Sequence, residues 1–202
     1  MKIELENSQA LSLERKIQMH EAREAIIDRL ARDLLDQDLP AKFSDILQRH
    51  HVAPGSFCLE ITESAIMDDP IRAQQTLERL HAMGVELSID DFGTGYSSLA
   101  YLKRLPVDEL KIDKSFVLNM ENDIGDTKIV RSTIDLGHNM GLRVVAEGIE
   151  SEAVWRLLAA LGCDQGQGYF MSRPIPGDKL VEWIRNWVPP VRSSLPYAAT
   201  VG

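Results

Sequence analysis

Near the middle of the chain stands the run Leu87-Ser88-Ile89-Asp90-Asp91-Phe92-Gly93-Thr94-Gly95-Tyr96-Ser97-Ser98, in which an apolar strand ends in two carboxylates and breaks into a glycine-rich turn. Two neighbouring acids repel each other, and a protein tolerates them best where metal cations lie between them. The turn then opens a helix at Ser97 or Ser98, whose N-terminal amides can face an anion. A metal and a phosphate are therefore the first expectation.

The composition limits the class of protein. The 202 residues suit one domain of ordinary size, and 44% apolar with 26% charged residues is near globular norms. The net charge of −9 argues against binding to long nucleic acid. It also repels a small anionic substrate at long range, so such a substrate needs local positive charge from metals and a placed lysine.

We expect no signal peptide, because the first residues are too charged, and the sequence holds no apolar run long enough to cross a bilayer. We therefore expect a cytoplasmic protein without membrane contact. Cys58 and Cys163 each stand in an apolar, strand-like run without ligand spacing around them, which predicts reduced core thiols.

Short β-rich runs alternate with amphipathic helical stretches from about residue 40 onward. The helices have recognisable ends at Asp69 and Gly84, at Asp126 and Gly141, and at Ser151 and Gly162. Strands joined by helices predict a parallel sheet. The expected strands are 57–61, 86–90, 109–113, 143–148 and 163–169.

This α/β pattern can close as an open doubly wound sheet or as a TIM-like (β/α) barrel. An ionisable or amide residue stands toward the C-terminal end of every expected strand, and in a barrel those ends converge on one mouth. We therefore favour the barrel. The polar residues in question are Glu60, Asp90, Lys111, Asp113, Glu147 and Gln167.

The barrel is expected to be incomplete at its N-terminal side, because five strands are visible and a full barrel has eight. We divide the chain into residues 1–39, mainly helical and replacing the first barrel strands, residues 40–188, the barrel portion, and residues 189–202, a loose tail. The first segment holds one strand candidate, 2–6, and a helical stretch from about 10 to 35.

Each candidate residue also has a purely structural explanation. Glu60 can be a salt-bridged structural acid, Asp90 and Asp91 can cap a turn, and Lys111 can neutralise a carboxylate. The functional interpretation is metal ligation by the three acids and a phosphate or water held by Lys111. The joint placement of these residues at successive strand ends favours the functional interpretation.

Five motifs in this order and spacing resemble the EAL domain family, the bacterial phosphodiesterases of cyclic di-GMP, over roughly residues 31–187. The resemblance implies a TIM-like barrel with two Mg²⁺ or Mn²⁺ ions at its mouth and hydrolysis of cyclic di-GMP to linear pGpG. The motifs are Leu59-Glu60-Ile61-Thr62-Glu63-Ser64, the run from Asp90 to Ser98, Leu110-Lys111-Ile112-Asp113, Val145-Ala146-Glu147-Gly148-Ile149-Glu150 and Gln167-Gly168-Tyr169-Phe170.

The resemblance also implies a role for each matching residue. Glu60, Asp90 and Asp91 are similar to the metal ligands of the family. Lys111, Glu147 and Gln167 are similar to its catalytic residues, Lys111 positioning water and phosphate and the other two belonging to the metal–water network. Glu63 resembles the anchor of the substrate-side loop, which contains Phe92, Gly93, Thr94 and Gly95 and couples dimerisation to activity in the family.

The chain departs from the family at its N-terminal side, where Asp28-Arg29-Leu30-Ala31 stands in place of the Asn-Leu-Ser-Ala strand end of the family. The Glu-Ala-Leu strand that names the family is absent, and with it a metal-ligand glutamate. We expect weak or absent hydrolysis, doubtful occupancy of the metal sites, and a barrel gap covered by the N-terminal helix or by a second copy of the chain. A binding module for cyclic di-GMP or for an unidentified protein partner is the alternative, and a fragment of an active parent is a third possibility.

Overall fold

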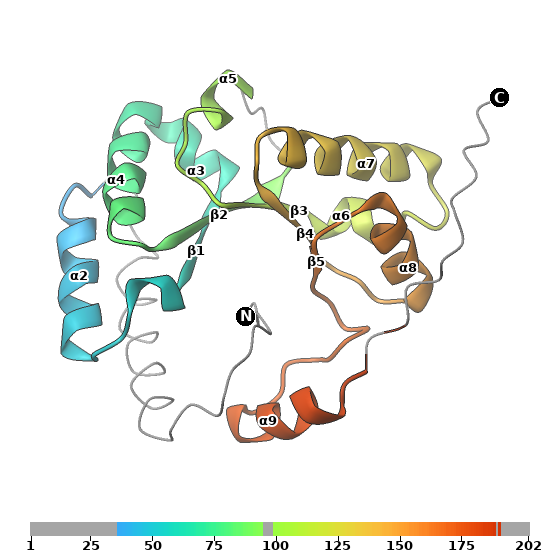
Figure 1. The fold of residues 1–202 in the computed structure, drawn as a ribbon. Helices are drawn as coiled ribbons and strands as arrows, with labels where there is room; N and C mark the ends of the chain where they lie inside the picture. Colours follow the sequence, from blue (N-terminus) through green and yellow to red (C-terminus); the bar gives the residue numbers. More distant parts are fainter. Residues whose placement is uncertain (1–35, 95–98, 189, 191–202) are drawn as a thin grey trace. The chain divides into compact units, whose positions relative to one another are not determined.

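The computed structural model describes residues 36–94, 99–188 and 190 (Figure 1). These residues form two compact units, one of residues 36–90 and 99–108 and the other of residues 91–94 and 109–190. Several expectations lie outside the described residues. They are the strand at 2–6, the helix at 10–35, the helix start at Ser97 or Ser98, the loop residue Gly95 and almost all of the tail.

The first unit is built on two parallel strands, β1 and β2, in which Glu60 pairs with Ser88 and Thr62 with Asp90. Helix α2 packs on α4, and α3 packs on both β1 and α4 (Figure 1). The elements are α2 (Leu39–Arg49), the 3-10 helix η1 (Pro54–Ser56), β1 (Cys58–Thr62), α3 (Glu63–Asp68), α4 (Pro70–Ala82), β2 (Glu86–Phe92), whose last two residues belong to the second unit, and α5 (Leu99–Leu102).

Helix α4 begins and ends where the sequence predicts. The carboxylate of Asp69 accepts a hydrogen bond of 3.2 Å from the backbone N–H of Arg72, and Pro70 occupies the first turn. Gly84 follows the helix with φ of +87°, a conformation that favours glycine. Leu77 and Leu80 are buried, so α4 covers the core of this unit.

The second unit is built on three parallel strands, with Lys111 opposite Val145 and Val145 opposite Gln165. Helix α7 packs against β3 and β4 (Figure 1). The elements are β3 (Glu109–Ile112), α6 (Lys114–Val117), α7 (Ile124–Asn139), β4 (Arg143–Ala146), α8 (Glu152–Leu161), β5 (Gln165–Gly166) and α9 (Gly177–Asn186).

The α/β class and the parallel pairing of strands are confirmed within both units, whereas closure into a barrel stays a prediction. Several boundaries differ from the sequence prediction: β2 runs on to Phe92 rather than ending at 90, and β4 ends at Ala146 rather than at 148. Two further differences have a clear cause in the structure. The strand expected over 163–169 pairs with β4 only at Gln165 and Gly166, because the backbone beyond it bonds to Ile149 instead. Helix α7 is capped by Asp123 rather than Asp126, and the Asp123 carboxylate accepts the N–H of Gly125 at 2.6 Å.

The two cysteines are thiols rather than a disulfide. Cys163 is buried, as expected of a core thiol, whereas Cys58 is only half-buried. Burial raises the pKa of the Cys163 thiol to about 12. In the part of the chain that the structure describes, no helix combines the length and apolar character that a membrane crossing requires.

Candidate functional site

An ion pair joins the ends of β3 and β4. The Nζ of Lys111 lies 2.5 Å from Oε1 of Glu147, and the two side chains are only 3% and 17% exposed. The backbone N–H of Glu147 also donates to the carbonyl of Ile112 at 3.2 Å, which holds the acid beside the end of β3. The structure therefore brings two of the predicted catalytic residues into direct contact.

A second ion pair lies at the opposite end of the same two strands. Glu109 is fully buried, and its Oε2 lies 3.7 Å from Nε of Arg143, the residue paired with it across the ladder. Glu109 and Lys111 share one face of β3 because side chains alternate along a strand. Strand β3 thus carries one acid and one base, and β4 begins with a base and is followed directly by an acid. The sequence pattern did not indicate the pair of Glu109 and Arg143.

Gln167 follows β5 and is fixed by the backbone on both sides. Its N–H donates to the carbonyl of Ala146 at 2.8 Å, and its carbonyl accepts the N–H of Ile149 at 3.1 Å. A Cβ on Gly168 would lie 2.1 Å from the carbonyl oxygen of Ile149, so only glycine allows this close approach. The side-chain Oε1 of Gln167 is buried and has no hydrogen-bond partner among the described residues. A buried oxygen without a partner is suited to accept a hydrogen bond from a ligand.

Asp91 stands at the start of the turn with φ of +54°, a left-handed conformation that few residues other than glycine adopt. Its carbonyl accepts the Thr94 hydroxyl at 2.8 Å, which closes the turn, and its side chain hydrogen-bonds to Asp113. Burial raises the pKa of Asp113, but hydrogen bonds from the hydroxyl and backbone N–H of Ser115 and from Asp91 outweigh it, so the pKa lies below its usual value of 3.8.

Asp113 was counted among the polar residues at strand ends but not among the candidate site residues. Its contact with Asp91 makes it a neighbour of the predicted metal ligand. The signal for it was present in the sequence, since it follows Lys111 by two positions in a run that otherwise contains only apolar residues.

The remaining acids of the prediction belong to the first unit. Glu60 and Asp90 project from the same face of the β1–β2 ladder, because Asp90 pairs with Thr62 and side chains alternate. Asp90 is half-buried and Glu60 is exposed. Glu63 is buried, with 4% of its surface exposed, in the first turn of α3.

The substrate-side loop is described up to Thr94. Phe92 is buried, whereas Gly93 and Thr94 are exposed. A Cβ on Gly93 would lie 3.2 Å from the ring of Phe116, and the φ of +98° at this position is again one that glycine adopts readily.

Metal ligation is the part of the prediction for which the described residues give least support. Across residues 36–94, 99–188 and 190, no three His, Cys, Asp or Glu side chains lie close enough together to hold a metal ion. The donor chemistry itself suits Mg²⁺ or Mn²⁺, because carboxylate and amide oxygens are hard ligands.

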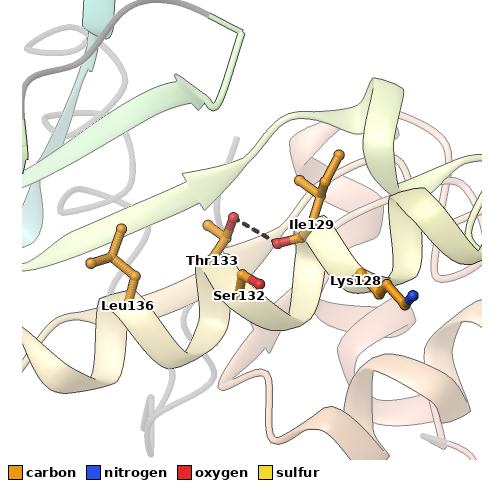
Figure 2. Close-up of a pocket in the computed structure, with 5 residues that line it drawn as sticks. All are labelled: Lys128, Ile129, Ser132, Thr133 and Leu136. Atoms are coloured by element: carbon orange, nitrogen blue, oxygen red, sulfur yellow. Dashed lines mark hydrogen bonds between the residues drawn. The ribbon is translucent and has the colours of Figure 1, made fainter.

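A hollow of about 310 Å³ lies on the outer side of α7 and contains none of the predicted site residues (Figure 2). The hydroxyl of Thr133 donates to the carbonyl of Ile129 at 3.0 Å within the same helix. The hydroxyl of Thr133 is therefore already satisfied within its own helix. The lining residues are Lys128, Ile129, Ser132, Thr133 and Leu136.

Comparison with known proteins agrees with this arrangement. The model of the EAL domain matches residues 5–174. The chain belongs to the EAL domain family. The match reaches further toward the N-terminus than the motifs from which the resemblance was drawn.

Curated relatives of this EAL domain are much longer proteins. It is 49% identical over 135 residues to the bifunctional diguanylate cyclase/cyclic di-GMP phosphodiesterase MucR of Pseudomonas aeruginosa, covering 67% of this chain and 20% of MucR. It is 39% identical over 178 residues to the cyclic di-GMP phosphodiesterase NbdA of the same organism, covering 86% of this chain and 23% of NbdA. The chain thus spans about a fifth of the length of these relatives.

Solved EAL structures have the same fold. The PaMucR phosphodiesterase in complex with c-di-GMP has a TM-score of 0.72 at 38% identity, covering 82% of this chain and 72% of that one. The EAL domain of Mycobacterium smegmatis DcpA has a TM-score of 0.74 at 37% identity, covering 88% and 86%. The EAL fold is a TIM-like barrel, which supports the fold class predicted from the sequence.

Proposed function

We propose that this EAL domain binds cyclic di-GMP at the ends of β3, β4 and β5 and hydrolyses it to linear pGpG slowly or not at all. The observation that carries the proposal is the contact between Lys111 and Glu147 at the ends of β3 and β4, together with the buried, unsatisfied Oε1 of Gln167 directly after the adjoining strand β5. The named activities of MucR and NbdA, and the nucleotide in the PaMucR complex, supply the identity of the ligand.

The charges of these residues suit a phosphodiester. The net charge of −9 repels an anion at long range, so recognition depends on a local cation. Lys111 is a compact cation on a buried stem at the end of β3, and it can exchange its hydrogen bond with Glu147 for one with a phosphate oxygen. Gln167 would complete the contact through its side-chain oxygen, which accepts a hydrogen bond from a bound water.

Divalent metal would be held in this proposal by Asp90 and Asp91, with Glu60 and Glu147 as further oxygen donors. When bound, Mg²⁺ or Mn²⁺ would supply an activated water and neutralise charge on the phosphate. The residues of this chain would hold the phosphate at Lys111 and orient the water network at Gln167.

Low activity follows from what this site lacks. The Glu-Ala-Leu strand of the family is absent from the sequence, and no three acids form a metal cage among the described residues. These two observations also favour the second candidate function, a module that binds cyclic di-GMP or an unidentified protein partner without turnover. Binding without hydrolysis distinguishes the second candidate from the first.

The proposal includes a homodimer, because a second copy of the chain can cover an exposed edge of a parallel sheet. Size-exclusion chromatography with light scattering measures the mass directly. We expect about twice the chain mass of 22.7 kDa. A monomer at all concentrations would remove the dimer from the proposal and leave the nucleotide site unaffected.

Product analysis tests the hydrolytic part of the proposal. The chain is incubated with cyclic di-GMP and Mn²⁺, and pGpG is separated by chromatography. We expect traces of pGpG that disappear in Glu147→Gln, with Glu121→Gln, an exposed acid of the same unit, as the matched control. Rapid turnover would refute the expected loss of activity, and traces that persist in Glu147→Gln would refute the assigned site.

A further inference from the structure

Hydrogen bonds link a histidine, an aspartate and a backbone amide of a strand in the first unit. Nε2 of His81, in the last turn of α4, lies 3.3 Å from Oδ1 of Asp108, the residue before β3. Oδ2 of the same carboxylate accepts the N–H of Leu87 in β2 at 2.9 Å, and the N–H of Asp108 donates to the carbonyl of Leu87 at 2.9 Å. We call this arrangement a clasp, because the side chain of Asp108 bonds both to the last turn of α4 and to the start of β2.

The second unit contains the same clasp. Nε2 of His138, in the last turn of α7, lies 2.9 Å from Oδ2 of Asp164, the residue before β5. That oxygen also accepts the N–H of Val144 in β4 at 2.8 Å, and the N–H of Asp164 donates to the carbonyl of Val144 at 3.2 Å. The bonded residues match those of the first clasp, although Oδ2 of Asp164 takes both side-chain bonds that the two oxygens of Asp108 divide between them.

The surrounding sequences match as well. His81-Ala82-Met83-Gly84-Val85 corresponds to His138-Asn139-Met140-Gly141-Leu142, and both glycines have positive φ. The difference in residue number between His81 and His138 also separates three buried pairs, which are Thr76 and Thr133, Leu77 and Ile134, and Leu87 and Val144. An offset one residue shorter relates the buried Leu102 to Leu158 and the clasp residue Asp108 to Asp164. The two segments are therefore equivalent over helix, strand, helix and strand.

The equivalence extends to the candidate site. Three positions after the clasped Leu87 stands Asp90, and three positions after the clasped Val144 stands Glu147. Three positions after Asp108 stands Lys111, and three positions after Asp164 stands Gln167 (its counterpart in the second copy). Each copy thus supplies one acid and one hydrogen-bonding side chain, each three positions along the sequence from a residue of its clasp.

Strand β5 shows why the clasp matters. Only Gln165 and Gly166 pair with β4, so few bonds fix its register. A slip of one residue would move a side chain by about 3.3 Å and turn it to the other face of the sheet. The clasp at Asp164 binds the start of this short strand, and the bond from Gln167 to Ala146 binds its end.

We infer that these segments are two copies of one unit and that Asp164, held by His138, is a positioning residue for Gln167. The part of this inference that concerns nucleotide affinity rests on the proposed function. The part that concerns Gln167 itself does not, because it can be measured without nucleotide.

Nuclear magnetic resonance of the ¹⁵N-labelled full chain tests the inference. In Asp164→Ala we expect the side-chain amide signal of Gln167 to shift and the backbone amides of Val144 and Gln167 to exchange about tenfold faster, which corresponds to the loss of one charge-assisted hydrogen bond. Asp164→Asn, which keeps an acceptor for Val144, is expected to restore most of the wild-type signal. His138→Ala, which keeps the bond between Asp164 and Val144, is expected to give the same changes in smaller degree.

Asp123→Ala serves as the matched control, because it removes an aspartate that caps α7 in the same unit without touching β5. It is expected to lower the melting temperature while the Gln167 signals stay in place. Wild-type exchange at Val144 and Gln167 in Asp164→Ala, or equal changes at Gln167 in Asp123→Ala, would overturn the inference. Cyclic di-GMP affinity is expected to fall about tenfold in Asp164→Ala. Failure of the wild type to bind counts against the proposed function, while the nucleotide-free spectra decide the role of Asp164.

Discussion

Lys111 and Glu147 form a buried ion pair with 2.5 Å between Nζ and Oε1, one residue on β3 and the other directly after β4. Two charges removed from water stabilise a protein only while both are present, because either one alone is left uncompensated in a poorly solvated place. The pair therefore holds the site together in the absence of ligand. A phosphate or a cation that enters the site competes with it.

Removal of the lysine tests this relationship. We expect Lys111→Ala to lower the free energy of unfolding by about 3 kcal/mol, because Glu147 then loses its cation in a buried position. The double variant Lys111→Met with Glu147→Leu is expected to unfold within about 1 kcal/mol of wild type. Urea unfolding followed by circular dichroism measures both. A double variant as unstable as Lys111→Ala would show that the pair contributes through more than its charges.

The glycine after Gln167 provides a test of backbone packing. We expect Gly168→Ala to destabilise the chain by more than about 3 kcal/mol, because its Cβ would meet the backbone of Ile149 at 2.1 Å. Gly162→Ala is the control, since its φ of +83° strains any side chain but nothing lies within 4 Å of the added atom, whereas the obstacle at Gly168 is the close approach alone. That variant is expected to cost about 1 kcal/mol. Equal costs for both variants, measured by thermal unfolding, would contradict the close approach.

The lowered pKa of Asp113 predicts that part of the free energy of unfolding is lost at acid pH. Its pKa in the folded chain lies below 3.8, so it contributes stability that is fully present above pH 3.8 and is lost as the pH falls through the folded pKa. Because the group is only half-buried and solvent screens its interactions, the contribution is at most about 1 kcal/mol. We expect the stability gap between wild type and Asp113→Asn to be constant from pH 7 to pH 5 and to shrink below pH 3.8. A gap that stays constant down to pH 3 would refute this assignment.

The two thiols are expected to differ in reactivity. Burial raises the pKa of Cys163 to about 12, and the thiolate is the reactive form. At pH 8 we expect a thiol reagent to modify Cys58 in the native chain and Cys163 only after denaturation. Cys58→Ser and Cys163→Ser identify which residue is modified. Fast native labelling in Cys58→Ser would contradict the burial of Cys163.

Much of the fold could be predicted because its signals are local. A cap such as Asp69 followed by Pro70, and an apolar run such as the one before Asp90, indicate helix and strand without knowledge of distant residues. The end of β5 could not be predicted, since its departure from the sheet depends on the backbone of Ile149. The cap of α7 was misplaced because Asp123 and Asp126 both suit the position, and the choice depends on where the chain turns.

In the candidate site, too, local patterns could be predicted and contacts between distant residues could not. Placement of Lys111 and Glu147 at the ends of neighbouring strands follows from the pattern, and their contact follows from the parallel register. The partner of Asp91 and the clasps at Asp108 and Asp164 are contacts between residues far apart in the sequence. Their residue types are ordinary on a protein surface, so no local pattern indicated them.

Calorimetric titration of the full chain with cyclic di-GMP in the presence of Ca²⁺ tests the central claim most directly. We predict saturable binding for wild type and for Lys128→Ala, which removes an exposed lysine of α7, and binding at least tenfold weaker for Lys111→Ala and Gln167→Leu. Gln167→Leu replaces an unsatisfied buried oxygen with apolar atoms, so it is expected to remain as stable as wild type. Wild-type affinity in Gln167→Leu and Lys111→Ala, or no binding by the wild type, would contradict the account.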